Sequence, residues 1–114
     1  MNKEEFENSM EWHDGILKDV KIECGESVSI KIFFDFYRGD AQEREQMAGD
    51  FYQVDDISIF IDSGELRRHK FAGNISNGYI NKIKRTKKYK FFLYLSDGFV
   101  SFTFRDFNIN SINC

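Results

Sequence analysis

The chain alternates apolar and polar residues over most of its length after residue 15. Apolar side chains recur at every second position of residues 28–37 and, apart from Lys18, of residues 16–24, and Gly25-Glu26-Ser27 separates the two runs. A period of two is typical of a strand, and two such runs across a short Gly-containing loop predict a β-hairpin. Cys24 ends the first run on its apolar phase, so we expect it to be a buried small hydrophobe.

A second hairpin is predicted near the C-terminus. Apolar residues alternate in residues 89–95 and again in residues 100–104, and Asp97-Gly98 is a turn signal between them. The apolar phase slips after Phe104, which predicts a β-bulge or bend near Asp106.

The segments between these hairpins are less regular. Residues 38–50 are polar with Gly near both ends, which predicts a loop with at most one helical turn, and residues 57–62 alternate as a third strand. Asn77-Gly78 predicts a hairpin turn, because a type I′ turn needs positive φ at both central positions. In the competing interpretation Tyr79, Ile80 and Ile83 form one face of a short helix.

Residues 3–12 carry Phe6 and Met10 four positions apart among acidic residues. This spacing fits a short N-terminal helix, and the segment fits a solvated lead-in equally well. The whole pattern predicts a mainly β fold, an antiparallel meander of six to eight strands that forms a small sandwich or barrel. A length of 114 residues fits one domain, 1–114.

Aromatic residues make up 17% of the chain and appear on both faces of several predicted strands. The residues concerned are Phe33, Tyr37, Phe60, Phe92, Tyr94 and Phe99. Either they lie between two layers of the fold, or they form a contact surface for a protein partner or a homodimer.

Charge is segregated along the sequence. Residues 67–90 contain no acid and hold nine of the 16 basic residues, so only seven bases offset the 19 acids elsewhere. The candidate binding residues of this segment are Arg67, Arg68, Lys84, Arg85, Lys87 and Lys88. They suit nucleic acid or another anionic ligand, but also a solvated loop that protects a sheet edge. The net charge of −3 disfavours nucleic acid, whereas the acidic remainder suits a basic protein partner.

The only cluster that resembles a reactive site is Trp12-His13-Asp14, which we treat as a candidate binding site. A His-Asp pair can ligate a metal in hydrolases, and such a site would combine His13 and His69 with Asp14, Asp55 or Asp56. Alternatively, Asp14-Gly15 turns the chain into the first strand and Trp12 covers the core.

Motifs of established chemistry are missing from the sequence. It contains no G-x-S-x-G, P-loop, G-x-G-x-x-G or C-x-x-C pattern. Two cysteines, Cys24 and Cys114, are too few for a disulfide framework, although a bridge between them stays open. We therefore predict no catalytic residue, no metal site and no cofactor. The acidic N-terminus and the lack of a run of about 20 apolar residues predict a cytoplasmic protein without a membrane span.

Three stretches resemble a known group of proteins: EWHDGILKDVKI at the start, then FAGNISNGYINKIK and LSDGFVSFTF. They are similar to small stand-alone bacterial all-β proteins of unassigned function, some of which are grouped with immunity proteins of polymorphic toxin systems. The resemblance spans most of the chain, and it implies an all-β fold and a non-enzymatic, partner-binding role. Toxins that cut nucleic acid are usually basic and are blocked by acidic inhibitors. The basic segment 67–90 departs from that pattern.

The leading functional hypothesis is thus a non-enzymatic cytoplasmic binding protein, in particular an immunity-type inhibitor of a partner protein. A nucleic-acid or anionic-ligand module that uses residues 67–90 is the second hypothesis. A metal-dependent hydrolase centred on His13 and Asp14 is the third.

Overall fold

The computed structural model describes residues 15–37, 44–61 and 73–111, and all the regular elements within these ranges are β-strands. The strands are β1 (Ile16–Cys24), β2 (Val28–Tyr37), β3 (Arg44–Tyr52), β4 (Asp55–Phe60), β5 (Gly73–Lys82), β6 (Tyr89–Leu95), β7 (Gly98–Phe104) and β8 (Asp106–Ser111). The described residues include no helix long and apolar enough to cross a membrane. The N-terminal helix expected over residues 3–12 lies outside the described residues.

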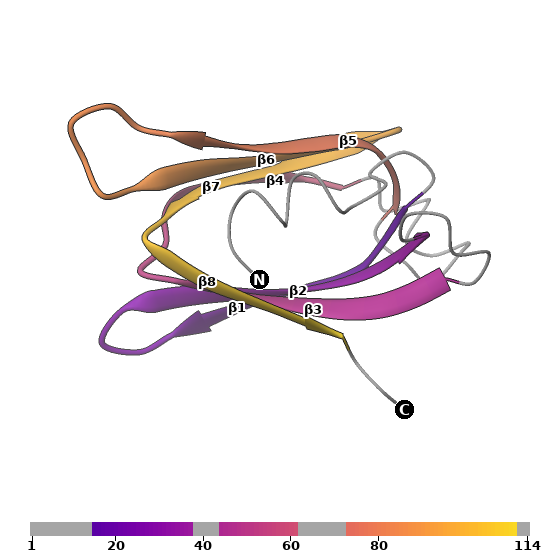
Figure 1. Ribbon diagram of the computed structural model, residues 1–114, viewed down its shortest axis with the longest axis horizontal. Coiled ribbons are helices and arrows are strands. Elements are labelled where there is room, and N and C mark those ends of the chain that lie inside the picture. The colour runs from indigo at the N-terminus through magenta and orange to yellow at the C-terminus, as the bar shows by residue number, and fades with distance from the viewer. Residues whose placement is uncertain (1–14, 38–43, 62–72, 112–114) are drawn as a thin grey trace.

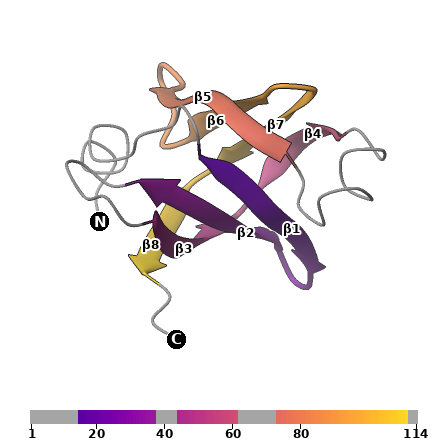
Figure 2. The same cartoon turned by 90° about the vertical axis from the view of Figure 1, so that its right-hand side faces the viewer.

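The strands form two antiparallel layers, as the sequence predicted. One layer contains β4, β7, β6 and β5, and the other contains β1, β2, β3 and β8 (Figure 1). At one corner β5 pairs with β1 through Ile16–Asn74 and Leu17–Gly73 (Figure 2). The N–H of Ile75 also donates to the carbonyl of Gly15 at 2.8 Å. Backbone hydrogen bonds therefore join the two layers at this corner.

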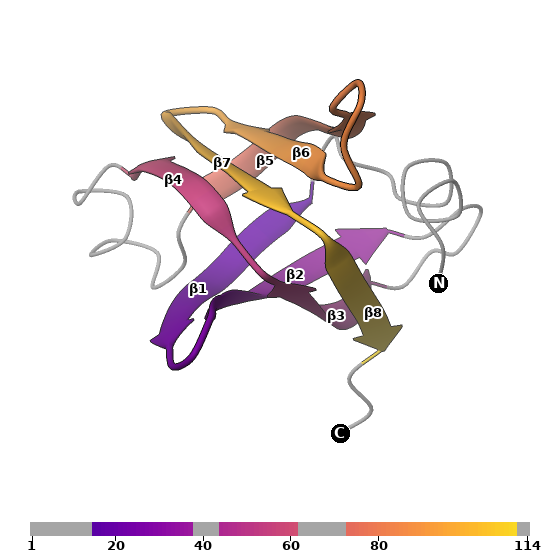
Figure 3. The same cartoon turned by 90° about the vertical axis from the view of Figure 1, so that its left-hand side faces the viewer.

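At the opposite corner two bent strands pass from one layer to the other. β3 continues into β4 at Gln53–Val54, and β7 continues into β8 at Arg105 (Figure 3). β3 pairs with β8 and β4 with β7, while the N–H of Arg105 donates to the carbonyl of Tyr52 at 3.1 Å. The eight strands thus behave as six long ones, and the two layers are joined at both corners, while β4 and β8 stand at the ends of the strand order. The bend predicted near Asp106 is confirmed, and it is the point where the chain changes layer.

Both predicted hairpins are confirmed. β1 and β2 pair from Cys24–Val28 to Ile16–Asp35, and β6 and β7 pair from Leu95–Gly98 to Tyr89–Phe104. The first hairpin has a bulge between Leu17 and Asp19, after which Val20 and Ile22 lie opposite the buried Ile32 and Ile30. Cys24 keeps this apolar phase, but the expectation that it is buried is wrong. Its side chain is exposed, as a free thiol, because the far end of the hairpin extends past the core.

The predicted loop at residues 38–50 is wrong over its second half, because β3 begins at Arg44. Met47, Gly49 and Phe51 alternate on the buried face of this strand. The apolar period was obscured because one of its three positions is a glycine. That glycine is needed there, since a Cβ at residue 49 would lie 2.7 Å from Cδ1 of Ile109 and 3.0 Å from Cε2 of Phe51.

The turn predicted at Asn77-Gly78 is also wrong, and so is the competing helix. Both residues lie inside β5, which continues to Lys82. The register shifts between Ile75 and Asn77, so this stretch is a bulge and the side chain of Asn77 accepts a 2.9 Å hydrogen bond from the N–H of Gly78. Pairing with β6 overrides the local preference of Asn77-Gly78 for positive φ. This pairing of β5 with β6 runs from Ile75–Leu95 to Lys82–Tyr89.

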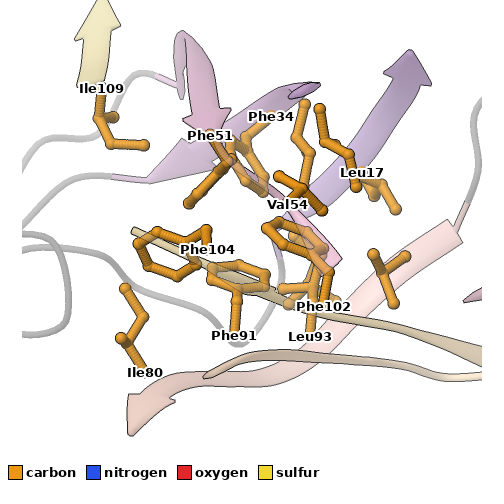
Figure 4. Packing of buried hydrophobic residues seen from close by; sticks show 14 of the residues in the cluster. Leu17, Phe34, Phe51, Val54, Ile80, Phe91, Leu93, Phe102, Phe104 and Ile109 are labelled. Carbon is orange, nitrogen blue, oxygen red and sulfur yellow. The ribbon is translucent and has the colours of Figure 1, made fainter. Parts of the chain in front are cut away.

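The core lies between the two layers and is built around Phe51 of β3 (Figure 4). Its ring centroid lies 5.3 Å from that of Phe91, 4.9 Å from Phe102 and 5.0 Å from Phe104, with tilted or edge-on geometry. Such arrangements add about 0.5–1.5 kcal/mol per pair to the gain from burial. Phe51 therefore ties the β3 layer to β6 and β7 of the other layer.

We expect Gly49→Ala to destabilise the fold by about 1–3 kcal/mol, because the added methyl group would overpack the site beside Ile109. Urea denaturation of the purified protein measures this change. Ile109→Val removes the Cδ1 atom that the new methyl would meet, so the double variant should be more stable than the sum of the two single losses predicts. Strictly additive losses would contradict this account.

Candidate functional site

The outer face of the layer made by β5, β6, β7 and β4 carries the most distinctive side chains of the described surface. Successive residues of a strand point to opposite faces. Because Phe91, Leu93 and Phe102 point into the core, Phe92 and Tyr94 on β6 and their neighbours on β7 point outward. The residues that point into the core thus determine which aromatic residues of the same strands point outward.

The register places these outward residues in two rows across the sheet. In one row Tyr79 lies opposite Phe92, which lies opposite Ser101. In the next row Tyr94 lies opposite Phe99, which lies opposite Phe60 of β4. We call the five residues Tyr79, Phe92, Tyr94, Phe99 and Phe60 the aromatic face.

Three rings of the aromatic face, those of Tyr79, Phe92 and Tyr94, contact one another, and three of its five side chains are exposed. The Tyr79 and Phe92 centroids are 5.0 Å apart in a stacked pair, and those of Phe92 and Tyr94 are 6.4 Å apart and nearly parallel. The exposed fractions are 59% for Phe60, 41% for Tyr94 and 38% for Phe99. The sequence left two alternatives for the aromatics on both faces. For these three residues the structure rules out burial between layers.

A shallow hollow of about 250 Å³ lies within the aromatic face. Phe92, Tyr94 and Phe99 line it together with the small side chains of Ser58 and Ser101. Large rings surrounding two serines leave an apolar recess with hydroxyl groups in its wall. This arrangement can accept an apolar or aromatic side chain of a partner.

Tyr79 and Tyr94 are joined by their hydroxyl groups, whose oxygens are 3.3 Å apart. This hydrogen bond raises the pKa of Tyr79 above its ordinary value, and partial desolvation and the charge of Tyr94 act in the same direction. The phenol of Tyr79 is therefore neutral at physiological pH and available as a hydrogen-bond donor or acceptor.

A basic turn, residues 83–88, connects β5 to β6 beside the aromatic face. Thr86 organises it: its Oγ1 donates to the carbonyl of Ile83 at 2.9 Å and accepts from the N–H of Lys88 at 3.1 Å. Arg85 has a φ of 66°, in the left-handed region. The side chains of Lys84, Arg85 and Lys87 are exposed as a result.

Two basic side chains near the turn make contacts with the strands, one with β4 and one within β6. Lys88 Nζ lies 3.1 Å from Oδ2 of Asp55 on β4, in an exposed ion pair. Lys90 Nζ lies 5.8 Å from the ring centroid of Phe92, at the border of the aromatic face. Cations and aromatic rings thus share one edge of this surface.

The structure brings only part of the predicted site residues together. Lys84, Arg85, Lys87 and Lys88 gather in the basic turn. Five of the predicted residues lie outside the described residues: Trp12, His13, Asp14, Arg67 and Arg68.

The metal hypothesis also depends on residues that lie outside this part of the chain. His13, Asp14 and His69 are among them, whereas Asp55 and Asp56 begin β4. Within residues 15–37, 44–61 and 73–111 no group of three or more His, Cys, Asp or Glu side chains could hold a metal ion. The hydrolase centred on His13 and Asp14 therefore stays a prediction.

Sequence reasoning did not single out Tyr79 as part of a site, nor Ile57 and Ile59 as exposed. The local pattern places Tyr79 in a hairpin or helix around Asn77-Gly78, and its register with Phe92 follows only from the true course of β5. The sequence did contain a signal for an outward-facing ring, namely the adjacent aromatics Phe91-Phe92. One of two neighbouring strand residues must point away from the core.

The fold and the site together define a small two-layered all-β protein with an exposed aromatic face beside a basic turn. A comparison of the chain with protein-family models, with curated proteins and with solved structures finds no match.

We expect Tyr94→Phe to lower the pKa of Tyr79 toward its ordinary value of about 10, because the hydroxyl that stabilises the neutral phenol is removed. NMR of the protein with ¹³C-labelled tyrosine resolves each phenol during a titration. Tyr52→Phe on β3 is the control and should leave Tyr79 unchanged. An unaltered Tyr79 titration in Tyr94→Phe would show that the hydroxyl contact has no such effect.

Proposed function

We propose that this chain is a non-enzymatic binding protein whose partner is another protein, and that the aromatic face is its docking surface. The observation that carries the proposal is the exposure of Phe60, Tyr94 and Phe99 on three adjacent strands. Contiguous exposed apolar patches mark interaction sites, and aromatic residues are enriched at interface centres. Burial of these three side chains in a complex would remove their apolar surface from water, which would stabilise the complex.

The specific form of this proposal is an immunity-type inhibitor that acts in the cytoplasm on a partner protein. Its support is the resemblance of the sequence to small proteins grouped with toxin systems, together with the acidic balance outside residues 67–90. An acidic surface steers a basic partner and disfavours partners of the same charge. The aromatic face would then provide the affinity, and the acidic residues outside residues 67–90 the rate of association.

A photoreactive benzoyl-phenylalanine at position 99 should form an adduct with one defined protein in the source cells, because position 99 lies in the aromatic face. Mass spectrometry identifies the adduct. The matched control carries the same group at position 22, since Ile22 is exposed on β1 of the other layer. Equal labelling at both positions, or no protein adduct at position 99, would contradict the proposal.

The purified partner then allows a quantitative test by calorimetry. Phe99→Ala and Tyr94→Ala should each weaken binding at least about tenfold, as expected for residues at the centre of an interface. Ile22→Ala should leave the affinity within about twofold. Unchanged affinity in both aromatic variants would place the docking surface elsewhere.

A single-stranded nucleic acid is the second candidate partner, and the position of Lys90 beside Phe92 favours it. Single-strand binding combines cations that follow the phosphate backbone with aromatic rings on which bases stack. The basic turn and the stacked Tyr79–Phe92 pair offer both components on adjoining surfaces.

If nucleic acid is the partner, a fluorescent 15-nucleotide oligothymidylate should bind at 50 mM salt and dissociate as the salt concentration increases. Combined Lys84→Ala and Lys87→Ala should reduce the slope of log affinity against log salt by about 1.4, which is about 0.7 for each phosphate that is no longer neutralised. Lys18→Ala on β1 is the control and should leave the slope unchanged. Absence of any anisotropy change at 50 mM salt would eliminate this candidate.

A further inference from the structure

β4 is an edge strand with one described neighbour. It stands at the end of the sheet order and pairs only with β7 among the strands that the structure describes. All six of its residues are exposed. An edge strand presents unpaired N–H and C=O groups, which form a template for another strand.

The side chains of β4 are unusually apolar for an open edge. The exposed fractions are 38% for Ile57, 36% for Ile59 and 59% for Phe60. Natural edge strands are commonly blunted by lysine, by proline or by inward-pointing charges. β4 has neither lysine nor proline, and its only charges, Asp55 and Asp56, lie at one end. The same end contains a bulge between Asp55 and Ser58, where Asp56 has a φ of 52°, so the regular edge is Ser58–Phe60.

The other strand at the end of the sheet order, β8, provides an internal comparison. Its exposed positions are polar, namely Asp106, Asn108 and Asn110, and its apolar Ile109 is buried. Only one of the two terminal strands therefore combines an edge position with exposed apolar side chains. The difference indicates that β4 is the edge suited to pairing.

The conformation of β4 from Ser58 to Phe60 is fixed in advance by regular pairing with β7. Phe60 lies opposite Phe99 and Ser58 opposite Ser101. Gly98 permits this close approach, because a Cβ at residue 98 would collide with the carbonyl oxygen of Phe60. A strand added to β4 would thus meet a preformed template, and it would extend the sheet that carries the aromatic face.

We propose that a protein partner adds an extended segment of its chain to β4 as a further strand. This inference rests on the proposed protein-binding function and names the form in which the partner is recognised. The segment carries β-branched or aromatic residues opposite Ile57 to Phe60, and a lysine or arginine opposite Asp56. Main-chain hydrogen bonds supply affinity and the alternating side chains supply specificity.

Charge complementarity distinguishes this occupant from a second copy of the chain. Asp55 already pairs with Lys88, but β4 contains no cation, so a β4 strand from another molecule could not neutralise Asp56. Antiparallel self-pairing about Ser58 would also place Asp56 against Phe60 of the other copy. A segment from a different protein can place a basic residue opposite Asp56 and an apolar residue opposite Phe60, so it can match both ends of β4.

The test selects a phage-displayed library of 10-residue peptides on the full protein. Enriched peptides should alternate β-branched or aromatic residues and carry a lysine or arginine near one end. A synthetic peptide of the enriched sequence should slow amide hydrogen exchange of residues 57–60 at least about tenfold. Ile59→Lys should weaken its binding at least about tenfold, because a lysine blunts the edge.

The matched control is Asn110→Lys, which adds the same charge to the β8 edge and should leave peptide affinity within about twofold. Circular dichroism and urea denaturation establish that each variant is folded, and Ile57→Lys replaces Ile59→Lys if the latter is not. Failure to enrich peptides, protection at β8 or β1 instead of β4, or a dimer paired through β4 would each overturn the inference.

The outcome is separable from that of the proposed function. Strand addition would be wrong and the docking surface correct if a protein adduct forms at position 99 while no peptide protects β4. Peptide binding at β4 without an adduct at position 99 would support strand addition and contradict docking through the aromatic face.

Discussion

The contact between Phe51 and three phenylalanines of the opposite layer is the interaction on which this fold depends. Phe51 is the residue through which β3 reaches Phe91, Phe102 and Phe104. In a domain of 114 residues few side chains are available to fill the space between two layers, and large rings fill it with the fewest residues. Gly49 makes room for this packing two residues earlier on the same strand.

The strands that change layer at the corner determine which side chains point outward once the core is packed. Because β3 turns into β4 and β7 into β8, each long strand contributes one half to either layer. The half that includes β7 must direct Phe102 and Phe104 inward, so Phe99 at the other phase points outward beside Phe60. The aromatic face is thus a geometric consequence of core packing, and its exposure is what makes it available to a partner.

Electrostatics divide the surroundings of this face. The basic turn lies at the β5–β6 end, where Lys90 borders Phe92, while Asp55 and Asp56 lie at the start of β4. The ion pair between Lys88 and Asp55 connects the two regions, and its exposure makes it a weak contributor to stability. A partner that spans the face therefore meets charges of both signs, which restricts its orientation more than its affinity.

The amino-acid sequence by itself determined the β class and the two hairpins, since alternation over residues 16–37 and 89–104 combined with Gly-containing turns leaves little choice of local structure. It could not identify β3, because Gly49 interrupts the apolar period and only its contact with Ile109 gives that glycine a buried position. Asn77-Gly78 likewise has a turn signal that pairing with β6 overrides. Which aromatic residues are exposed was decided by the tertiary structure alone. Alternation specifies two faces for each strand, but only the packing of one layer on the other determines which of the two is covered.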